Sequence, residues 1–455
     1  MGANRPNPVY NYSMEILDNL TTGLEAGTAT SSGVALPPTV RVTTLPNGLR
    51  VATDTMPSVE SATVGIWTNC GARHETESEN GVAHLLEHML FKGTERRSAQ
   101  AIAEEIEAVG GQMNAYTARE NTAYYARVLK EDVALAVDIV ADLLQHSVFD
   151  EAELGRERSV VLQEIGQAND TPDDIIFDHF QGAAFPGQPM GRPVLGTPET
   201  VANMSRSALT GYLTTHYVPS ELVLTAAGAV DHDRLVDQAL KQFDRLPSAK
   251  PPASSPIAYG GGDFRVEQDL EQLHFLIGFQ GAAIGDADYY AQSVLSTVLG
   301  GGMSSRLFQE VREKRGLVYA IYSFASAYQD GGVFGVYAGT GASEIAELVP
   351  VVCDELQKVI HHVDEAELAR ARAQIRAGLL MSMESTMSRA EQLGQHLLLF
   401  GRAIPTREII EKIDQVDVAA VQKAAAKLFS SRPTIAAMGP LGNLEAYDLT
   451  VRRFS

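Results

Sequence analysis

His84-Leu85-Leu86-Glu87-His88 is the stretch from which the rest of this sequence is best interpreted. On an α-helix, residues four apart point within about 40° of each other, so His84 and His88 share one face and Glu87 lies beside them. The two leucines fall on the opposite arc, where they would bury the helix. Two imidazoles on one face can bind one Zn²⁺, and a neighbouring carboxylate can accept a proton from water. The alternative is a helix that carries two ordinary surface histidines.

A catalytic zinc site needs a third protein ligand, and a second helix offers candidates. The apolar positions predict a long helix from Asp150 to Gln167, which carries Glu157 and Glu164 roughly on one face. We expect Glu164 to be the third ligand and Glu157 to orient a histidine or to buffer charge. The alternative is a solvated acidic face.

Two longer segments contain these residues, namely Gly81-Val-Ala-His84-Leu-Leu-Glu87-His88-Met-Leu-Phe91-Lys-Gly-Thr94 and Glu157-Arg-Ser-Val-Val-Leu-Gln-Glu164-Ile. Together they resemble the pitrilysin/insulinase family of zinc peptidases, which carry the inverted motif H-x-x-E-H. Within that family the likeness is to the β subunits of mitochondrial processing peptidases and their small bacterial relatives, from about Val40 to the C-terminus. The resemblance implies one Zn²⁺ per chain, held by His84, His88 and Glu164, with Glu87 as the catalytic base.

Composition is compatible with a soluble enzyme of more than one domain. The chain has 455 residues, of which 45% are hydrophobic, and no apolar run reaches the roughly 18 residues of a membrane span. Cys70 and Cys353 give no disulfide framework, so we expect buried thiols in a reducing compartment. The formal charge of −21 argues against nucleic-acid partners. It suits an enzyme that attracts basic peptides, although acidity also serves solubility alone.

We divide the chain into a flexible N-terminal extension (1–38), a zinc-binding catalytic domain (39–246), a linker rich in Pro, Ser and Gly (247–262) and a homologous domain without zinc (263–455). The extension lacks the pattern of a secretory signal, and it carries acidic residues that a mitochondrial presequence usually avoids. We therefore expect a bacterial cytoplasmic protein, with the mitochondrial matrix as the alternative.

The two halves repeat one order of elements. The first is expected to contain strands near Arg41–Thr53 and Ala62–Asn69, the zinc helix, a helix at Ala99–Val109, and strands at Met113–Ala118 and Asn121–Leu129. The second is expected to contain a strand at Gln272–Gly278, helices at Tyr289–Leu299 and Ser305–Arg315, and strands at Val318–Ala327 and Gly332–Ala338. This repetition indicates a duplication in which the second copy lacks the zinc motif.

The order of elements predicts an α+β fold of two homologous α/β sandwiches, each an antiparallel-rich sheet with helices packed on one face. The family resemblance implies that both domains form half of a clamshell, so that a closed chamber takes two chains. We therefore predict a homodimer, with a heterodimer containing a homologous subunit as the alternative.

The second domain carries a glycine-rich loop at Gly300, Gly301 and Gly302 and an Arg/Tyr pair at Arg312 and Tyr319. Three glycines after a helix permit a tight, mobile loop, although a simple connector is the alternative. The resemblance implies that the loop handles substrate. It also implies that Arg312 and Tyr319 grip the peptide and stabilise the oxyanion from the partner chain. Arg315 lies close enough in sequence to leave the register of the arginine open.

Substrate contacts are expected on the first domain. Asn114, Ala115 and Tyr116 lie on a predicted strand, and in relatives the matching edge adds the substrate as a further strand. The resemblance also places Phe91 beside the residue after the cut, and Asp174 and Asp178 around an arginine two residues before it. A core position for Phe91 and a solvated helix face for the two aspartates are the alternatives.

These expectations combine into a zinc metalloendopeptidase that cleaves extended peptides in a closed two-chain chamber, with a preference for basic peptides. Glu87 would take a proton from water at the zinc and pass it to the leaving amine. The alternatives are a non-catalytic or partner-dependent subunit of a larger complex, and a zinc hydrolase of another substrate.

Overall fold

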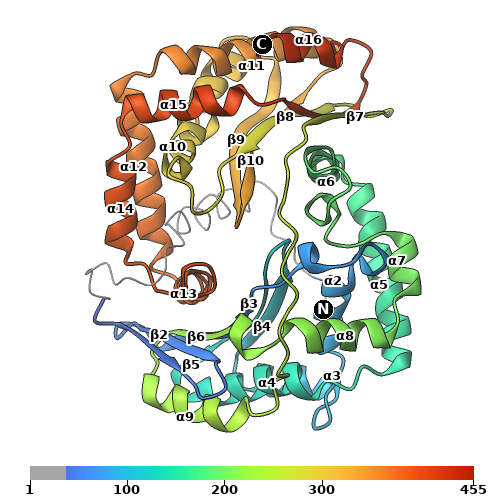
Figure 1. Ribbon diagram of the computed structural model, residues 1–455, viewed down its shortest axis with the longest axis vertical. Coiled ribbons are helices and arrows are strands. Elements are labelled where there is room, and N and C mark those ends of the chain that lie inside the picture. Colours follow the sequence, from blue (N-terminus) through green and yellow to red (C-terminus); the bar gives the residue numbers. More distant parts are fainter. Residues whose placement is uncertain (1–36, 455) are drawn as a thin grey trace.

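The computed structural model of this chain describes residues 37–454. It contains two α/β halves, each built on one mixed sheet, which lie one above the other in Figure 1. The extension predicted at residues 1–38 falls almost wholly outside the described residues.

The first sheet has the spatial order β1-β2-β6-β3-β5-β4, in which β2 and β6 are parallel and all other neighbours are antiparallel. Its strands are β1 (Val40–Thr44), β2 (Arg50–Thr55), β3 (Ser61–Thr68), β4 (Gln112–Thr117), β5 (Thr122–Leu129) and β6 (Leu222–Gly228). The segment expected as a strand near residues 41–53 is a hairpin of two strands. Its turn contains Gly48 at φ 97°, a backbone conformation that glycine adopts without strain.

The second sheet has the order β7-β11-β8-β10-β9, with β7 and β11 parallel and the other pairs antiparallel. Its strands are β7 (Gly262–Glu267), β8 (Leu273–Gly281), β9 (Val318–Tyr328), β10 (Gly331–Thr340) and β11 (Thr434–Gly439). Apart from β1, the two sheets therefore share one connectivity and one pattern of strand directions. This agreement supports the predicted duplication, and it makes β4 and β9 corresponding edge strands.

Each sheet packs its main helical layer on one face. In the first half, Val64 and Ile66 of β3 face a core shared with Leu85 and Leu86 of helix α2. The helices of this half are α2 (Val82–Leu90), α3 (Ala99–Ala108), α4 (Val133–His146), α5 (Glu151–Asn169), α7 (Pro198–Asn203), α8 (Arg206–His216) and α9 (His232–Gln242). Those of the second are α10 (Tyr289–Gly300), α11 (Ile345–His361), α12 (Glu365–Ser382), α14 (Thr406–Asp414), α15 (Val418–Phe429) and α16 (Tyr447–Arg452).

Two helices cross over to the opposite half. Helix α6 (Pro172–Ala184) packs on β7, β8 and β11 of the second sheet, and α13 (Thr386–Phe400) packs on β2, β3 and β6 of the first. Figure 1 shows α6 beside the upper sheet and α13 above the lower one. Phe180 of α6 joins a core with Leu276, and Trp67 of β3 packs against Ala390 of α13. The predicted one-sided layer thus describes the main helices, and each exchanged helix covers the remaining face.

Polar contacts also join the two halves. Buried Arg73 bonds Glu120 in the first half and, at 2.7 Å, Asp330 in the turn between β9 and β10. Nη2 of Arg73, which contacts Asp330, also donates to the carbonyl of Ser255, which lies in a segment without helix or strand at residues 246–261. That segment covers most of the predicted linker. Most of its residues are exposed, and from Ser255 onward it bonds residues of both halves.

Two further expectations concern the whole chain. Cys70 and Cys353 are buried free thiols, as predicted, and burial raises the pKa of each to about 12. Across residues 37–454, each helix is too short or too polar to cross a membrane.

Candidate metal centre

The candidate centre is built on α2. This helix buries six residues against the first core: Val82, Ala83, Leu85, Leu86, Met89 and Leu90. The same 3.6-residue repeat leaves His84, Glu87 and His88 partly exposed on the opposite side, as the sequence predicts. The motif is therefore held on a rigid, buried helix.

Glu164 of α5 completes a group of three potential ligands. Its Oε2 lies 3.7 Å from Nε2 of His84 and 3.6 Å from Nε2 of His88. One ligand atom from each of these three residues lies within 4.8 Å of the others. Ligands of a tetrahedral zinc ion with bonds of about 2.1 Å stand about 3.4 Å apart, so this arrangement is close to that needed around one ion.

Glu157 holds one histidine in the form that binds metal. Its Oε2 lies 3.0 Å from Nδ1 of His88, and its Oε1 accepts from Nζ of Lys92 at 2.8 Å. Burial opposes ionisation of Glu157, but the bonds from His88 and Lys92 prevail and lower its pKa. A charged Glu157 places the imidazole proton on Nδ1 and leaves the lone pair of Nε2 facing Glu164. The donor set and this tautomer both fit a Zn²⁺ ion.

Glu87 lies next to the three potential ligands on the same helix. Oγ1 of Thr117, the last residue of β4, donates to Oε2 of Glu87 at 2.6 Å. The pKa of Glu87 lies above its ordinary value because burial disfavours the charged form. The bond from Thr117 and the proximity of His88 act in the opposite direction but are outweighed. A carboxylate with a raised pKa is better suited to accept and release a proton near neutral pH.

The start of the zinc helix is held by a buried acid that the sequence analysis did not identify. Glu75 accepts from the backbone N–H groups of Gly81 and Ala83 and from the side chain of Asn80, at 2.8–2.9 Å. Gly81 has φ 94°, which favours glycine, so the chain turns sharply into α2 there. Glu75 lies too far before α2 for a standard capping pattern, and its role follows only from the folded chain.

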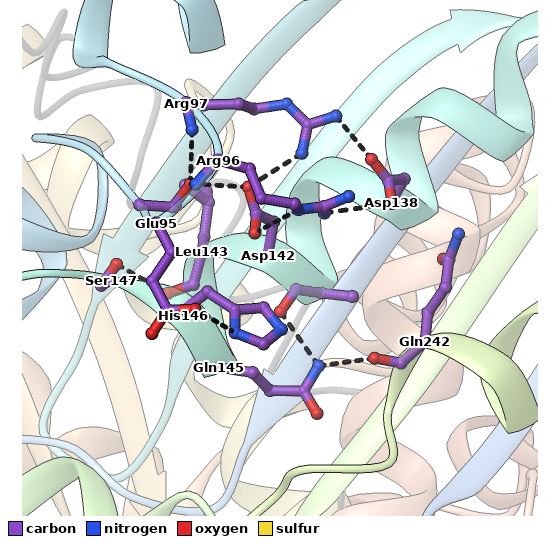
Figure 2. A network of polar contacts seen from close by, with 12 residues as sticks. Glu95, Arg96, Arg97, Asp138, Asp142, Leu143, Gln145, His146, Ser147 and Gln242 are labelled. Atoms are coloured by element: carbon purple, nitrogen blue, oxygen red, sulfur yellow. Dashed lines mark hydrogen bonds and ion pairs between the residues drawn. The ribbon is translucent and has the colours of Figure 1, made fainter.

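The segment after α2 is held by a network of charges. Figure 2 shows Arg96 and Arg97 reaching Asp138 and Asp142 of α4. Asp142 is 1% exposed, and it also accepts from Thr94 at 2.7 Å. Burial raises its pKa, but these bonds outweigh burial and lower it. The network fixes the segment that follows Phe91 and Lys92, and so supports the Lys92–Glu157 pair.

The residues expected to contact substrate lie on different elements. Asn114, Ala115 and Tyr116 are on β4, which is the edge strand of the first sheet, as predicted. Phe91 ends α2 and is partly buried, with its ring centroid 6.3 Å from that of Tyr124. This packing agrees with the alternative of a partly core role for Phe91.

Asp174 and Asp178 are on the exchanged helix α6. Asp178 accepts from Arg119 at 2.9 Å, and Arg119 belongs to the turn between β4 and β5. In this structure the carboxylate of Asp178 is therefore already paired with an arginine of the same chain.

Arg312 and Tyr319 lie together in the second half. The guanidinium carbon of Arg312 is 5.9 Å from the ring centroid of Tyr319 on edge strand β9, and it lies 4.7 Å from that of Phe308. Arg315 instead pairs with Glu347, which settles which arginine stacks on Tyr319. Arg312 and Tyr319 lie on the second half of the chain, whereas the three potential metal ligands lie on the first.

The segment predicted as a helix from Ser305 to Arg315 contains a π-helix at Phe308–Glu313, and Arg312 lies on it. The glycines before it also have a role in packing. A Cβ on Gly300 would come within 2.3 Å of the backbone nitrogen of Ser323, and one on Gly301 within 2.7 Å of Thr297. These two glycines therefore allow close packing at the end of α10, and the looser position is Gly302.

The structure is a duplicated α+β fold with a candidate His/His/Glu metal site on its first half. Its sequence matches the model of the insulinase family (peptidase family M16) at residues 50–198, and that of the peptidase M16 inactive domain at residues 203–375. The chain belongs to the insulinase family, which confirms the predicted resemblance.

Individual relatives agree. The chain is 42% identical to an uncharacterized zinc protease of Streptomyces coelicolor, over 90% of this chain and 92% of that protein. It is 41% identical to a probable mitochondrial-processing peptidase subunit beta of Arabidopsis thaliana, over 91% of this chain and 81% of that protein. The crystal structure of a protease from Helicobacter pylori matches with a TM-score of 0.82, at 22% identity, over 89% of this chain and 100% of that one. This last likeness concerns the fold.

Proposed function

We propose that this chain is a zinc-dependent endopeptidase that cleaves extended peptides. The observation that carries the proposal is the convergence of His84, His88 and Glu164 beside Glu87, with Glu157 fixing the tautomer of His88. One Zn²⁺ per chain is the corresponding cofactor. The names of the relatives from Streptomyces coelicolor and Arabidopsis thaliana support a protease.

In this proposal each residue has one task. His84, His88 and Glu164 hold the zinc, which supplies Lewis acidity when bound. Glu87 accepts a proton from the attacking water and passes it to the leaving amine. Because Thr117 holds Oε2 of Glu87, we assign the proton transfer to Oε1.

The proposed substrate is an unfolded peptide that adds as a strand to β4. The terminal place of β4 in its sheet supports this, because an edge strand offers unpaired backbone groups. Asn114, Ala115 and Tyr116 would supply the strand contacts, and Phe91 would flank the residue after the cut. Asp174 and Asp178 would receive a basic residue, with Arg119 displaced from Asp178. The charge of −21 supports a preference for basic peptides.

We further propose that two chains enclose the substrate, with Arg312 and Tyr319 of one chain facing the centre of the other. Tyr319 is 77% exposed and stacks with Arg312, which supports a role at an interface or on a substrate. Gly300, Gly301 and Gly302 would contribute backbone to the same wall. A homodimer is the simplest form, and the processing-peptidase relative supports a heterodimer as the alternative. Two buried thiols support a reducing compartment, for which we propose the bacterial cytoplasm, with the mitochondrial matrix as the alternative.

The test is cleavage of a quenched basic peptide by the purified chain. We expect cleavage that a chelator abolishes and zinc restores, and a loss of about 10²–10⁴-fold in kcat for Glu87→Gln with zinc content unchanged. Glu107→Gln, on the exposed side of α3, is the matched control and should retain full activity. Wild-type rates in the Glu87→Gln protein would remove the proposed base.

A partner-dependent subunit of a larger complex is the second candidate function. The relative named as a β subunit favours it. Zinc bound at one ion per chain without cleavage, and cleavage only after a homologous subunit is added, would establish this alternative.

A further inference from the structure

Adjacent residues of β4 are anchored on opposite faces of the sheet. Thr117 bonds Glu87 on the side of the zinc helix, and Met113 and Ala115 pack against the same core. Tyr116 points to the other face, where its hydroxyl donates to Oε1 of Glu391 at 2.5 Å. The strand proposed to bind substrate is thus held from both sides.

Glu391 is a buried carboxylate that the proposed chemistry does not use. It is 5% exposed, and among the described residues it forms one hydrogen bond, from Tyr116, and no ion pair. Burial raises its pKa, because the charged form loses water that one hydroxyl replaces only in part. Most buried acids in globular proteins are paired, so a carboxylate with this environment indicates a specific role.

Glu391 reaches β4 from the second half of the chain. It belongs to the exchanged helix α13, 275 positions away from Tyr116. Other bonds of α13 go to the middle of the first sheet: Thr386 contacts Thr63 of β3, and the carbonyl of Ala390 accepts from Thr225 of β6. Among the described residues, the Glu391–Tyr116 bond is the hydrogen bond that joins this helix to edge strand β4.

We propose that Glu391 is a positioning residue for substrate binding: through Tyr116 it fixes edge strand β4 in the orientation that accepts a peptide as a neighbouring strand. This inference rests on the proposed peptidase function. It makes α13, and so the second half of the same chain, part of the substrate site. Loss of the bond removes one polar restraint on the orientation of Tyr116 and of β4, so peptide binding weakens while the proton transfer by Glu87 continues.

The experiment measures peptide binding and cleavage in the full-length, zinc-loaded protein. Binding of a fluorescent, unstructured basic peptide is followed by anisotropy in the Glu87→Gln background, and KM and kcat are measured in the active protein. We expect Glu391→Leu and Tyr116→Phe each to raise Kd and KM about tenfold, the effect of losing one hydrogen bond, with kcat within about twofold of wild type. Glu391→Gln keeps an acceptor for the hydroxyl and should restore values close to wild type.

Two comparisons separate positioning from general support. The double variant Glu391→Leu/Tyr116→Phe should bind no more weakly than either single one, because both remove the same bond. Thr386→Ala removes another bond between α13 and the first sheet, and it should leave Kd and KM unchanged. Unchanged Kd in both single variants, additive losses in the double variant, or an equal loss in Thr386→Ala would each overturn the inference. A wild-type protein that binds the peptide but never cleaves it would instead refute the proposed peptidase.

Discussion

Replacing Glu157 by glutamine tests whether the residue behind a ligand controls the metal. The change keeps the size of the side chain and an acceptor for Nδ1 of His88, but it removes the charge that Lys92 and His88 share at 2.8 and 3.0 Å. The amide can either accept from Nδ1 of His88 or donate to it, so the tautomer of His88 is no longer fixed, and Lys92 is left beside a neutral group.

The expected effect is on zinc affinity more than on folding. Carboxylates that orient metal-bound histidines typically contribute about 10–100-fold to affinity, which is about 1.4–2.7 kcal/mol. Because Glu157 is 4% exposed, solvent screens this interaction little, and we expect the upper half of that range.

The assay is competition for zinc against a chelator of known affinity, with unfolding by urea as a check on the fold. Glu153→Gln is the matched control, because Glu153 lies one turn earlier on α5 and pairs with Arg156 at the surface. It should bind zinc as wild type does. A folded Glu157→Gln protein with wild-type zinc affinity would refute the reasoning.

Three further predictions concern stability. His74 has its pKa lowered from 6.5 to about 4, by burial first and then by His216 and Arg73, so the folded protein resists its protonation while the unfolded chain does not. The contribution of neutral His74 to the free energy of unfolding is therefore present above pH 6.5. It is lost as pH falls from about 6.5 to about 4, by up to ~3 kcal/mol. Urea midpoints at pH 7.5 and pH 5 should thus differ less in His74→Asn than in wild type. Asp142→Ala should lower the free energy of unfolding by about 1–3 kcal/mol, since it removes the buried acceptor of Thr94, Arg96 and Arg97 while Asp138 still pairs with both arginines, and a wild-type urea midpoint would contradict this. Gly300→Ala should destabilise by ~1–3 kcal/mol through its contact with Ser323, while Gly302→Ala, whose Cβ would meet only the flexible end of Gln374 at 3.4 Å, should unfold like wild type.

The residues of the candidate metal centre could be predicted from the sequence because most of them lie close together along the chain. His84, Glu87 and His88 lie on one helical turn, and periodicity alone places them opposite the leucines. Glu157 and Glu164 share a helix face for the same reason. What periodicity does not show is that α5 lies against α2, and there the family resemblance supplied the link.

Other features depend on packing between distant segments. An amphipathic pattern shows that α6 and α13 each bury one face, but it does not show which sheet they cover. For the same reason the sequence does not show that the site has contacts with Thr117, Lys92 and Glu391. Gly300 and Gly301 suggested mobility because glycine permits it, whereas the structure uses their lack of a side chain for close packing.

The exchange of α6 and α13 also determines when either half can be completed during synthesis. Once the ribosome has passed residue 246, every strand of the first sheet has been made, yet the helix that covers Trp67 begins only at Thr386. Helix α6 is made early, and it has no sheet to cover until β8 and β11 follow. Separately expressed halves would each expose an apolar sheet face, so segments of both halves are needed to cover both faces of either sheet.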